Sequence, residues 1–297
     1  MSVATSVARA LGVAVGASHP IGGGDVGEGW RLELADGRTV YAKTRAGAPD
    51  GLFTAEAAGL SWLAAASALP VPAVLAVAEG SDDDPPVLVL PWIQPHRHGH
   101  RDEEALGRGL ATLHRAGAPS YGFNGPGFIG PLPLDNRNAV TWAEFWWVRR
   151  IEPFLRLAVD AGALDADGAA EIADLEDEVT ELLGPAEPIA RLHGDLWTGN
   201  ILWSEDGRPW LIDPSAYGGR PPTRGRCPST DPREGGRSAR AARGARRPAP
   251  PGRRSRLLHR RPERPHPLPG AGPARSAAPT RTPPRWPSCG CPAGGGR

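Results

Sequence analysis

The chain changes character at residue 220, and this break limits which part of it can form a hydrophobic core. Residues 220–297 contain 19 Arg, 17 Pro and 11 Gly, and their large apolar residues are Leu257, Leu258, Leu268 and Trp286. Such a composition cannot bury enough apolar surface to offset the entropy that ordering costs. We therefore expect residues 1–219 to fold and residues 220–297 to form a disordered tail.

Three explanations for this tail stay open. It is a basic arm that binds nucleic acid or an anionic surface, a low-complexity extension without a role, or an out-of-frame translation of a GC-rich gene. Arg, Pro, Gly and Ala all have codons made of G and C, so a shifted frame would be rich in them. The composition break favours the frame shift, whereas aromatic residues do not interleave the arginines, apart from Trp286, and this argues against nucleic-acid binding.

Charge and cysteine content separate the same two regions. Residues 1–219 carry 15 Lys and Arg against 30 Asp and Glu, a net charge of −15, whereas the 19 Arg and 3 acids of residues 220–297 give +16. The negative charge of residues 1–219 does not favour nucleic-acid binding.

All three cysteines lie in the tail, so the folded part needs no disulfide. No apolar leader and no segment long enough to cross a membrane occurs. We expect a cytoplasmic protein that is not bound to a membrane.

The first 93 residues have the pattern of a small antiparallel sheet with one helix. Residues 30–43 alternate between apolar and polar side chains around Asp36-Gly37, a favoured hairpin turn. The Ala- and Leu-rich residues 52–69 predict a helix that stops before Pro70. Residues 71–78 and 87–93 predict two further strands. These elements would make an N-terminal lobe over residues 1–93.

Residues 94–219 are mostly helical in pattern and form the second predicted lobe. Asp102 could cap a helix whose Leu106, Leu110 and Leu113 share one face. Thr141 and Glu144 form a capping box for a helix that runs to about residue 161. An apolar stripe over residues 172–182 predicts a third helix that ends at Gly184. Short strands then surround residues 193–200 and end at residue 213.

The stretch HGDLWTGN, residues 193–200, carries the strongest chemical signal. Asp195 and Asn200 have the D-x-x-x-x-N spacing of a kinase catalytic loop, and Asp213 follows a short hydrophobic strand. Phosphoryl transfer needs one carboxylate to accept the hydroxyl proton, and an amide with a second carboxylate to hold Mg²⁺ against the phosphates. Each residue alone would be read as an ordinary turn residue. Together they predict a phosphotransferase site, with His193 orienting the loop through a backbone hydrogen bond.

Lys43 is the only lysine in the chain and ends the second strand of the predicted hairpin. Glu56 follows on the next helix. A lysine on a strand paired with a glutamate on a helix is how a kinase-like lobe holds the α- and β-phosphates of a nucleotide. The glycine run Gly22, Gly23 and Gly24 precedes the hairpin, where backbone N–H groups can approach phosphates. An ordinary turn explains that run equally well, and no Gly-Lys-Ser/Thr follows it as in a Walker loop.

At this point the sequence resembles the fructosamine kinase (ketosamine kinase) family, which is related to the aminoglycoside phosphotransferases. The resemblance covers about residues 1–219, and Trp197 after HGDL distinguishes it from the aminoglycoside enzymes. The segments that carry it are HGDLWTGN, LIDPSAYGG, GGGDVGEGWRLELADGRTVYAKT, EAAGLSWL, VPAVLAV, LHR, FIGPLPLDN and WAEFWWVRRIEP.

The resemblance implies an α+β, two-lobed protein-kinase-like fold, with a small antiparallel sheet lobe and a mostly helical lobe. It implies ATP- and Mg²⁺-dependent phosphorylation of a sugar hydroxyl on a ketosamine, a small-molecule substrate in which a sugar is joined to an amine. Asp195 would be the base, Asn200 and Asp213 the Mg²⁺ ligands, and Lys43 with Glu56 the phosphate grip. Trp197 would shape the sugar pocket.

The sequence departs from the family after Gly219. There the family continues with a His-Arg-Glu-x-Asp-like stretch and further helices, whereas Arg220 begins the Arg/Pro segment. If the chain is read as written, the second lobe lacks its last helices and exposes core surface. Three rival functions therefore stay open: a kinase for an aminoglycoside or another hydroxyl-bearing metabolite, an inactive truncated kinase-like protein, and a binding protein that uses the basic tail.

Overall fold

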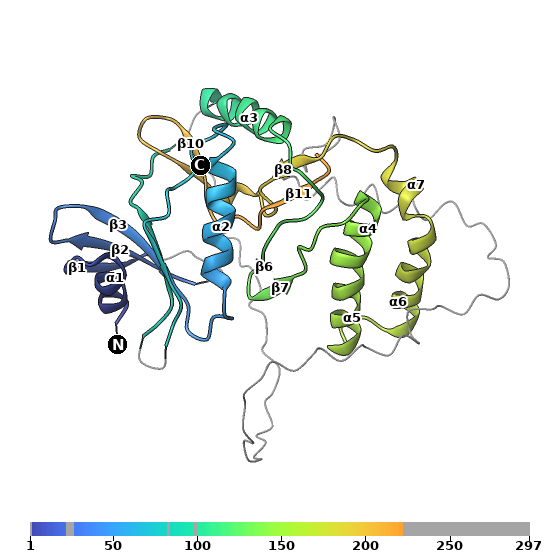
Figure 1. The fold of residues 1–297 in the computed structure, drawn as a ribbon, viewed down its shortest axis with the longest axis horizontal. Helices are drawn as coiled ribbons and strands as arrows, with labels where there is room; N and C mark the ends of the chain where they lie inside the picture. The colour runs from blue at the N-terminus through green and yellow to red at the C-terminus, as the bar shows by residue number, and fades with distance from the viewer. Residues whose placement is uncertain (1, 22–26, 82–83, 98–99, 222–297) are drawn as a thin grey trace, which may run out of the picture. The chain divides into compact units, whose positions relative to one another are not determined.

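The computed structural model describes residues 2–21, 27–81, 84–97 and 100–221 (Figure 1). The predicted glycine loop at Gly22, Gly23 and Gly24 lies outside these residues, as does the predicted disordered tail from residue 222 onward. The first part of the chain forms α1 (Val3–Leu11), β1 (Val15–Ile21), β2 (Glu28–Leu34), β3 (Thr39–Thr44), α2 (Leu52–Ala64), β4 (Ala76–Ala78) and β5 (Val87–Pro91).

The five strands form one antiparallel sheet in the order β1-β2-β3-β5-β4. Successive side chains on a strand point to opposite faces, and β3 shows how this divides the sheet. Val40 and Ala42 pack with α1, whereas Tyr41 packs beside α2 and Lys43 reaches Glu56 on that helix. The two helices therefore cover opposite faces of the sheet (Figure 1), and Lys43 lies on the α2 face.

The structure confirms the predicted hairpin and corrects two neighbouring predictions. Strands β2 and β3 pair around the Asp36-Gly37 turn, where Gly37 has a φ of 85°. Helix α2 ends at Ala64 rather than residue 69, and β4 covers only the end of the strand predicted over residues 71–78. Proline at positions 70 and 72 explains the shorter strand, since proline cannot donate to a sheet ladder. Helix α1 was not predicted.

The second part of the chain is richer in helix. Its elements are α3 (His100–Arg115), β6 (Gly127–Ile129), β7 (Leu132–Leu134), α4 (Trp142–Trp146), the π-helical turn η1 (Trp147–Ile151), α5 (Glu152–Asp160), α6 (Ala166–Ala173), the 3₁₀ turn η2 (Asp174–Asp177), α7 (Val179–Leu183), β8 (Ala190–Leu192), the 3₁₀ turn η3 (Thr198–Asn200), β9 (Ile201–Trp203), β10 (Pro209–Leu211) and β11 (Tyr217–Gly219). Pairs β6-β7, β9-β10 and β8-β11 are two-stranded and antiparallel.

Two of the three predicted helices start or continue differently from the prediction. Helix α3 begins at His100, so Asp102 lies in its first turn instead of capping it. The helix predicted over residues 172–182 is interrupted by η2 between α6 and α7. The predicted stripe on α3 is confirmed, because Leu113 is fully buried and Leu106 and Leu110 pack in the same cluster.

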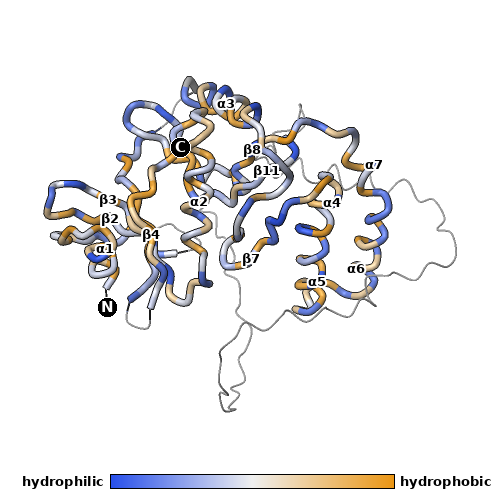
Figure 2. The backbone as a smooth tube through the Cα atoms, in the orientation of Figure 1, coloured by the Kyte–Doolittle hydropathy of each residue, from blue (hydrophilic) through white to orange (hydrophobic). Residues whose placement is uncertain are grey.

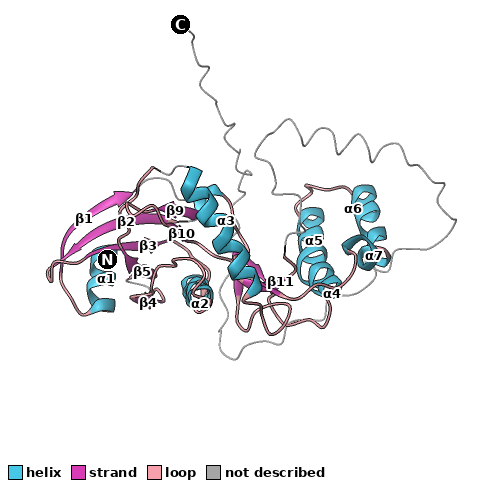
Figure 3. Cartoon of the chain, turned by 90° about the horizontal axis from the view of Figure 1, so that it is seen from above, coloured by secondary structure: helices cyan, strands magenta, loops and turns pink. Residues whose placement is uncertain are grey.

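The helix predicted from Thr141 is confirmed as α4, η1 and α5 in direct succession. Thr141 has extended backbone geometry, and its side chain accepts a hydrogen bond from the Glu144 backbone N–H at 3.1 Å. The Glu144 carboxylate accepts from the Val140 N–H instead of the Thr141 N–H, so the reciprocal bond lies one residue before the predicted capping box. Seen from above, α5 and α6 lie side by side (Figure 3).

Replacing Thr141 with alanine should lower the free energy of unfolding by about 1 kcal/mol, because the first turn of α4 loses its side-chain cap. Urea unfolding followed by circular dichroism measures this change. Thr112→Ala is the matched control, because Thr112 lies inside α3 and its hydroxyl donates back to the Arg108 carbonyl. Equal stability losses in both variants would contradict the assigned cap.

Large apolar side chains stay exposed on the helices that follow η1. Leu157 on α5, Leu175 on η2 and Leu182 on α7 are 49%, 42% and 64% exposed. Figure 2 shows that α5, α6 and α7 carry both hydrophobic and hydrophilic residues. If part of the core surface of this lobe is uncovered, leucines on consecutive amphipathic elements are expected to be exposed in this way. The predicted domain boundaries at residues 93 and 219 stay predictions.

None of the described helices combines the length and the apolar character that a membrane crossing needs.

Candidate active site

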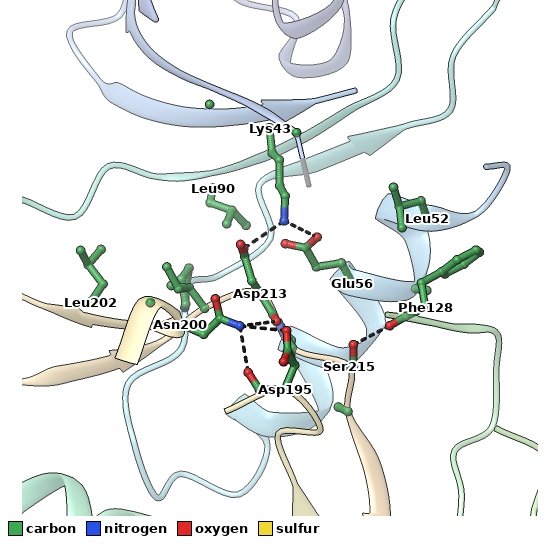
Figure 4. Close-up of a pocket in the computed structure, with 18 of the residues that line it drawn as sticks. Lys43, Leu52, Glu56, Leu90, Phe128, Asp195, Asn200, Leu202, Asp213 and Ser215 are labelled. Atoms are coloured by element: carbon green, nitrogen blue, oxygen red, sulfur yellow. Dashed lines mark hydrogen bonds and ion pairs between the residues drawn. The ribbon is translucent and has the colours of Figure 1, made fainter. Parts of the chain in front are cut away.

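A cavity of about 630 Å³ lies on the α2 face of the sheet. Sheet strands, the β6-β7 hairpin and the segments around residues 195–202 and 212–216 contribute its walls. Six of the residues singled out in the sequence line it, namely Lys43, Glu56, Asp195, Trp197, Asn200 and Asp213. Segments more than 150 residues apart in the sequence therefore meet in one site, as Figure 4 shows.

Lys43 lies between two carboxylates in the wall of the cavity. Its Nζ atom is 2.9 Å from Glu56 Oε2 and 3.1 Å from Asp213 Oδ1. The Lys43 and Glu56 side chains are buried, with 7% and 10% exposed, whereas Asp213 is partly open. The predicted pairing of Lys43 with Glu56 is thus present as a contact, and Asp213 joins it (Figure 4).

The protonation states of Lys43 and Glu56 depend on burial and on the short distances between the charged groups. Burial disfavours the charged form of Lys43, but the Glu56 and Asp213 carboxylates outweigh it and raise the lysine pKa above its usual value. Burial raises the pKa of Glu56 to about 7, although attraction to Lys43 acts the other way. Lys43 is therefore a protonated, desolvated cation at neutral pH, which suits it to bind an anion.

Asp195 and Asn200 are joined directly to each other. The Asn200 Nδ2 atom donates to the Asp195 backbone carbonyl at 2.8 Å and to Asp195 Oδ2 at 3.2 Å. This amide therefore orients the carboxylate and leaves Asp195 Oδ1 for another partner. It also leaves the Asn200 Oδ1 atom as an acceptor.

His193 holds the loop in place, as the sequence predicts. Its Nε2–H donates to the Ile212 carbonyl at 2.9 Å, and its Nδ1 atom accepts from the Asp195 N–H at 3.3 Å. Burial lowers the pKa of His193, so the ring is neutral and can make both contacts. Gly194 next to it has a φ of 85°, and a side chain there would begin 1.8 Å from the Ser215 carbonyl oxygen. Only glycine fits at this position.

Asp213 has an unusual backbone conformation. Its φ of 53° lies in the left-handed region, which residues other than glycine adopt rarely and at some cost. The bend turns its carboxylate toward Lys43 at the end of the β10 segment. Strain at a residue that points into a cavity is typical of a functional site.

Trp197 lies at the rim of the cavity with 53% of its surface exposed. Its indole ring covers Gly199, where an added Cβ would be 2.3 Å from the ring. An exposed aromatic ring at a cavity mouth offers an apolar face with a hydrogen-bond donor at its edge.

Tyr41 is a cavity residue that the sequence analysis missed. It lies two positions before Lys43 on β3 and so shares its face of the sheet, which is a signal that the sequence contains. The ring occupies space opened by Gly29, whose Cβ would lie 3.0 Å from it. Burial, followed by repulsion from Asp213, raises the pKa of Tyr41 to about 12, so its hydroxyl stays protonated.

The donor set fits a magnesium ion. Asp213 supplies a carboxylate and Asn200 an amide oxygen, and hard oxygen ligands are what Mg²⁺ prefers. The described residues contain no cluster of three or more His, Cys, Asp or Glu side chains that could hold a metal. A magnesium ion here would therefore need oxygens from a bound phosphate as well, as is usual in phosphotransferases.

Comparisons with known proteins show the family to which the chain belongs. The model of the fructosamine kinase family matches residues 1–222. A Thermus thermophilus protein assigned as a ketoamine kinase is 38% identical over 209 residues, which cover 69% of this chain and 70% of that protein. A solved structure assigned as a fructosamine-3-kinase, from Thermobifida fusca, is 41% identical with a TM-score of 0.65, over 74% of this chain and 75% of that chain.

The fold is shared more widely than the sequence. A thermostable mutant of the aminoglycoside phosphotransferase APH(4)-Ia, solved with AMP-PNP and hygromycin B, has a TM-score of 0.52 at 17% identity, over 74% and 73% of the two chains. This likeness concerns the fold and confirms the predicted protein-kinase-like architecture. The family match covers most of the chain and ends two residues after the composition break at residue 220. The chain belongs to the fructosamine kinase family and is a small-molecule kinase.

Proposed function

We propose that this protein transfers the γ-phosphoryl group of ATP to a sugar hydroxyl of a ketosamine. The observation that carries the proposal is the contact of Lys43 with both Glu56 and Asp213, in the cavity that also holds the Asp195–Asn200 pair. Membership of the fructosamine kinase family supports the substrate class. The excess of acids in residues 1–219 also favours a ketosamine, whose secondary amine is a cation near neutral pH.

In this proposal Asp195 accepts the proton of the substrate hydroxyl through its Oδ1 atom, which accepts no hydrogen bond from a described residue. The substrate oxygen then forms a bond to the γ-phosphorus, the bond from that phosphorus to the bridging oxygen breaks, and ADP leaves. The bond from Asn200 Nδ2 keeps the carboxylate of Asp195 aimed at the hydroxyl. Orienting the attacking oxygen and placing charge near the phosphates supply most of the acceleration in such reactions.

Lys43 would bind the α- and β-phosphates, and Glu56 would hold the lysine in place. Asn200 Oδ1 and Asp213 would hold Mg²⁺, which neutralises the charge of the phosphates when it is bound. Trp197 would cover the sugar. Gly22, Gly23 and Gly24 stay proposed phosphate-loop residues.

Use of ATP, together with the absence of cysteine from residues 1–219, supports a cytoplasmic location.

An acceptor panel tests the substrate class. ADP release would be followed with purified protein, Mg-ATP and one acceptor at a time: fructosyl-lysine, free fructose and an aminoglycoside. We expect the largest kcat/KM with fructosyl-lysine, because in this panel only fructosyl-lysine is a ketose sugar joined to an amine. A preference for the aminoglycoside would contradict the proposal and favour the first rival function.

A further inference from the structure

Asn136 is a buried polar residue in the cavity wall that the proposed chemistry does not use. It follows β7, lines the cavity and is only 3% exposed. Burying a side-chain amide is costly unless each polar atom finds a partner. The partners of its two polar atoms therefore show what this residue can do.

Arg150 fixes the orientation of the Asn136 amide. Its guanidinium donates to Asn136 Oδ1 at 2.5 Å and to the Asp135 carbonyl at 2.8 Å. The same guanidinium packs over the rings of Phe145 and Tyr217, at 4.5 and 4.8 Å from their centroids. A guanidinium has donors only, so the amide atom that faces Arg150 must be the oxygen. The NH₂ group of Asn136 is then turned away from Arg150.

Among the hydrogen bonds of the described residues, the Asn136 side chain takes part through Oδ1, and none has Nδ2 as its donor. The NH₂ group lies against Gly127 of β6, where an added Cβ would be 2.3 Å from Nδ2. Gly127 also lines the cavity, and its φ lies outside the left-handed region. Glycine is needed there for space. The missing side chain leaves room for a buried, rigidly held donor beside the cavity.

The position of Asn136 decides which substrate could use this donor. The β6-β7 hairpin is tied to the Asp213 segment, because Ser215 Oγ donates to the Phe128 carbonyl at 2.5 Å. Figure 4 shows Phe128 and Ser215 on one side of the Lys43–Asp213 contact and Leu202 on the other. Asn136 lies against Gly127 of this hairpin and so belongs to the part of the cavity wall that the hairpin forms. A substrate that lies against the hairpin is therefore the one that could use this donor.

We propose that Asn136 Nδ2 donates a hydrogen bond to an oxygen of the phosphate acceptor, and that Arg150 acts as the positioning residue for this amide. The inference rests on the proposed function, because it requires an acceptor that carries several hydroxyl or carbonyl oxygens. A hydrogen-bond donor that is held in place by a cation distinguishes well between substrates. A substrate without an oxygen at the matching position leaves the Asn136 NH₂ group unpaired.

Two substitutions of different chemistry test this role. Asn136→Asp keeps an oxygen for Arg150 but replaces the donor with an acceptor. Gly127→Ala keeps the Asn136 amide and leaves the net charge of the cavity unchanged, but it places a methyl group against Nδ2. Both variants should raise the KM for fructosyl-lysine by about tenfold or more, with the KM for ATP unchanged. Agreement between them excludes an effect of the added charge of the aspartate.

Asn138→Asp and Gly107→Ala are the matched controls. Asn138 is exposed and lies outside the main cavity, and the Gly107 site on α3 has open space for a Cβ. Both controls should keep the wild-type KM for either substrate. Melting temperatures show which variants are folded, and if Asn136→Asp does not fold, Gly127→Ala decides alone.

Suppose that the wild-type protein transfers phosphate to fructosyl-lysine and that a folded Gly127→Ala protein has the same KM for this acceptor. This result would overturn the inference. No transfer by the wild-type protein to any acceptor would instead overturn the proposed function and this inference with it. The two failures are therefore distinguishable in one set of assays.

Discussion

Replacing Asp195 with asparagine is expected to lower kcat by at least about 10²-fold, because the variant cannot accept the proton of the substrate hydroxyl. Asparagine has nearly the same shape, so the loop held by His193 and Asn200 should stay folded. Release of ADP with fructosyl-lysine as acceptor measures the loss, and nucleotide binding by calorimetry should be unchanged.

Asp160→Asn is the matched control for Asp195→Asn. Asp160 is exposed at the end of α5, so the same change of charge occurs away from the cavity. The control should turn over at the wild-type rate. If Asp195→Asn also kept the wild-type kcat, Asp195 would not be the base, and another residue would have to be found for that role.

Replacing Lys43 with methionine is expected to remove turnover and to lower the free energy of unfolding by about 3–5 kcal/mol. The substitution leaves Glu56 and Asp213 facing each other without the cation between them, and an uncompensated buried charge is strongly destabilising. Urea unfolding and ADP release, measured on the same preparation, give the two effects.

The double variant Lys43→Met with Glu56→Gln separates stability from catalysis. The amide removes the buried negative charge, so much of the lost stability should return. Turnover should not return, because the cation that would bind the phosphates is still missing. Recovery of both would show that Lys43 acts only through folding, which would contradict its proposed role in binding phosphate.

The fold was predictable where a local pattern determined the structure. The β2-β3 hairpin follows from alternation around Asp36-Gly37, and the start of α4 follows from the Thr141 cap. The interruption of the third predicted helix by η2 was not predictable, because an apolar stripe does not show where a helix tightens. Helix α1 has a sequence signal as well, since Val3 and Val7 lie one turn apart, and both are buried.

The candidate site was predictable for residues in motifs. Lys43, Glu56, Asp195, Asn200 and Asp213 all line one cavity. Asn136 ends FIGPLPLDN, a segment that carries the family resemblance, but no motif marks it as a site residue, because its proposed role depends on Arg150 and Gly127, which belong to different elements. Contacts of this kind arise from tertiary packing. Neither the spacing of residues in a motif nor the periodicity of apolar residues predicts such packing.

Residues 220–297 bear on the expected activity of the chain as written. The family match ends at residue 222, and leucines of α5, η2 and α7 are exposed. We propose that restoring the reading frame over codons 210–235 would supply apolar sequence to cover them. Sequencing the gene across these codons tests this, and a confirmed Arg/Pro frame with no open alternative would contradict it.

The most direct test of the central claim is to identify the product of the reaction. The full 297-residue chain would be incubated with Mg-ATP and fructosyl-lysine, and the products examined by phosphorus NMR and mass spectrometry. We expect a phosphomonoester on the sugar that appears in step with ADP and is absent with Asp195→Asn. ADP release without any phosphorylated sugar, or no reaction by a folded protein, would contradict the account.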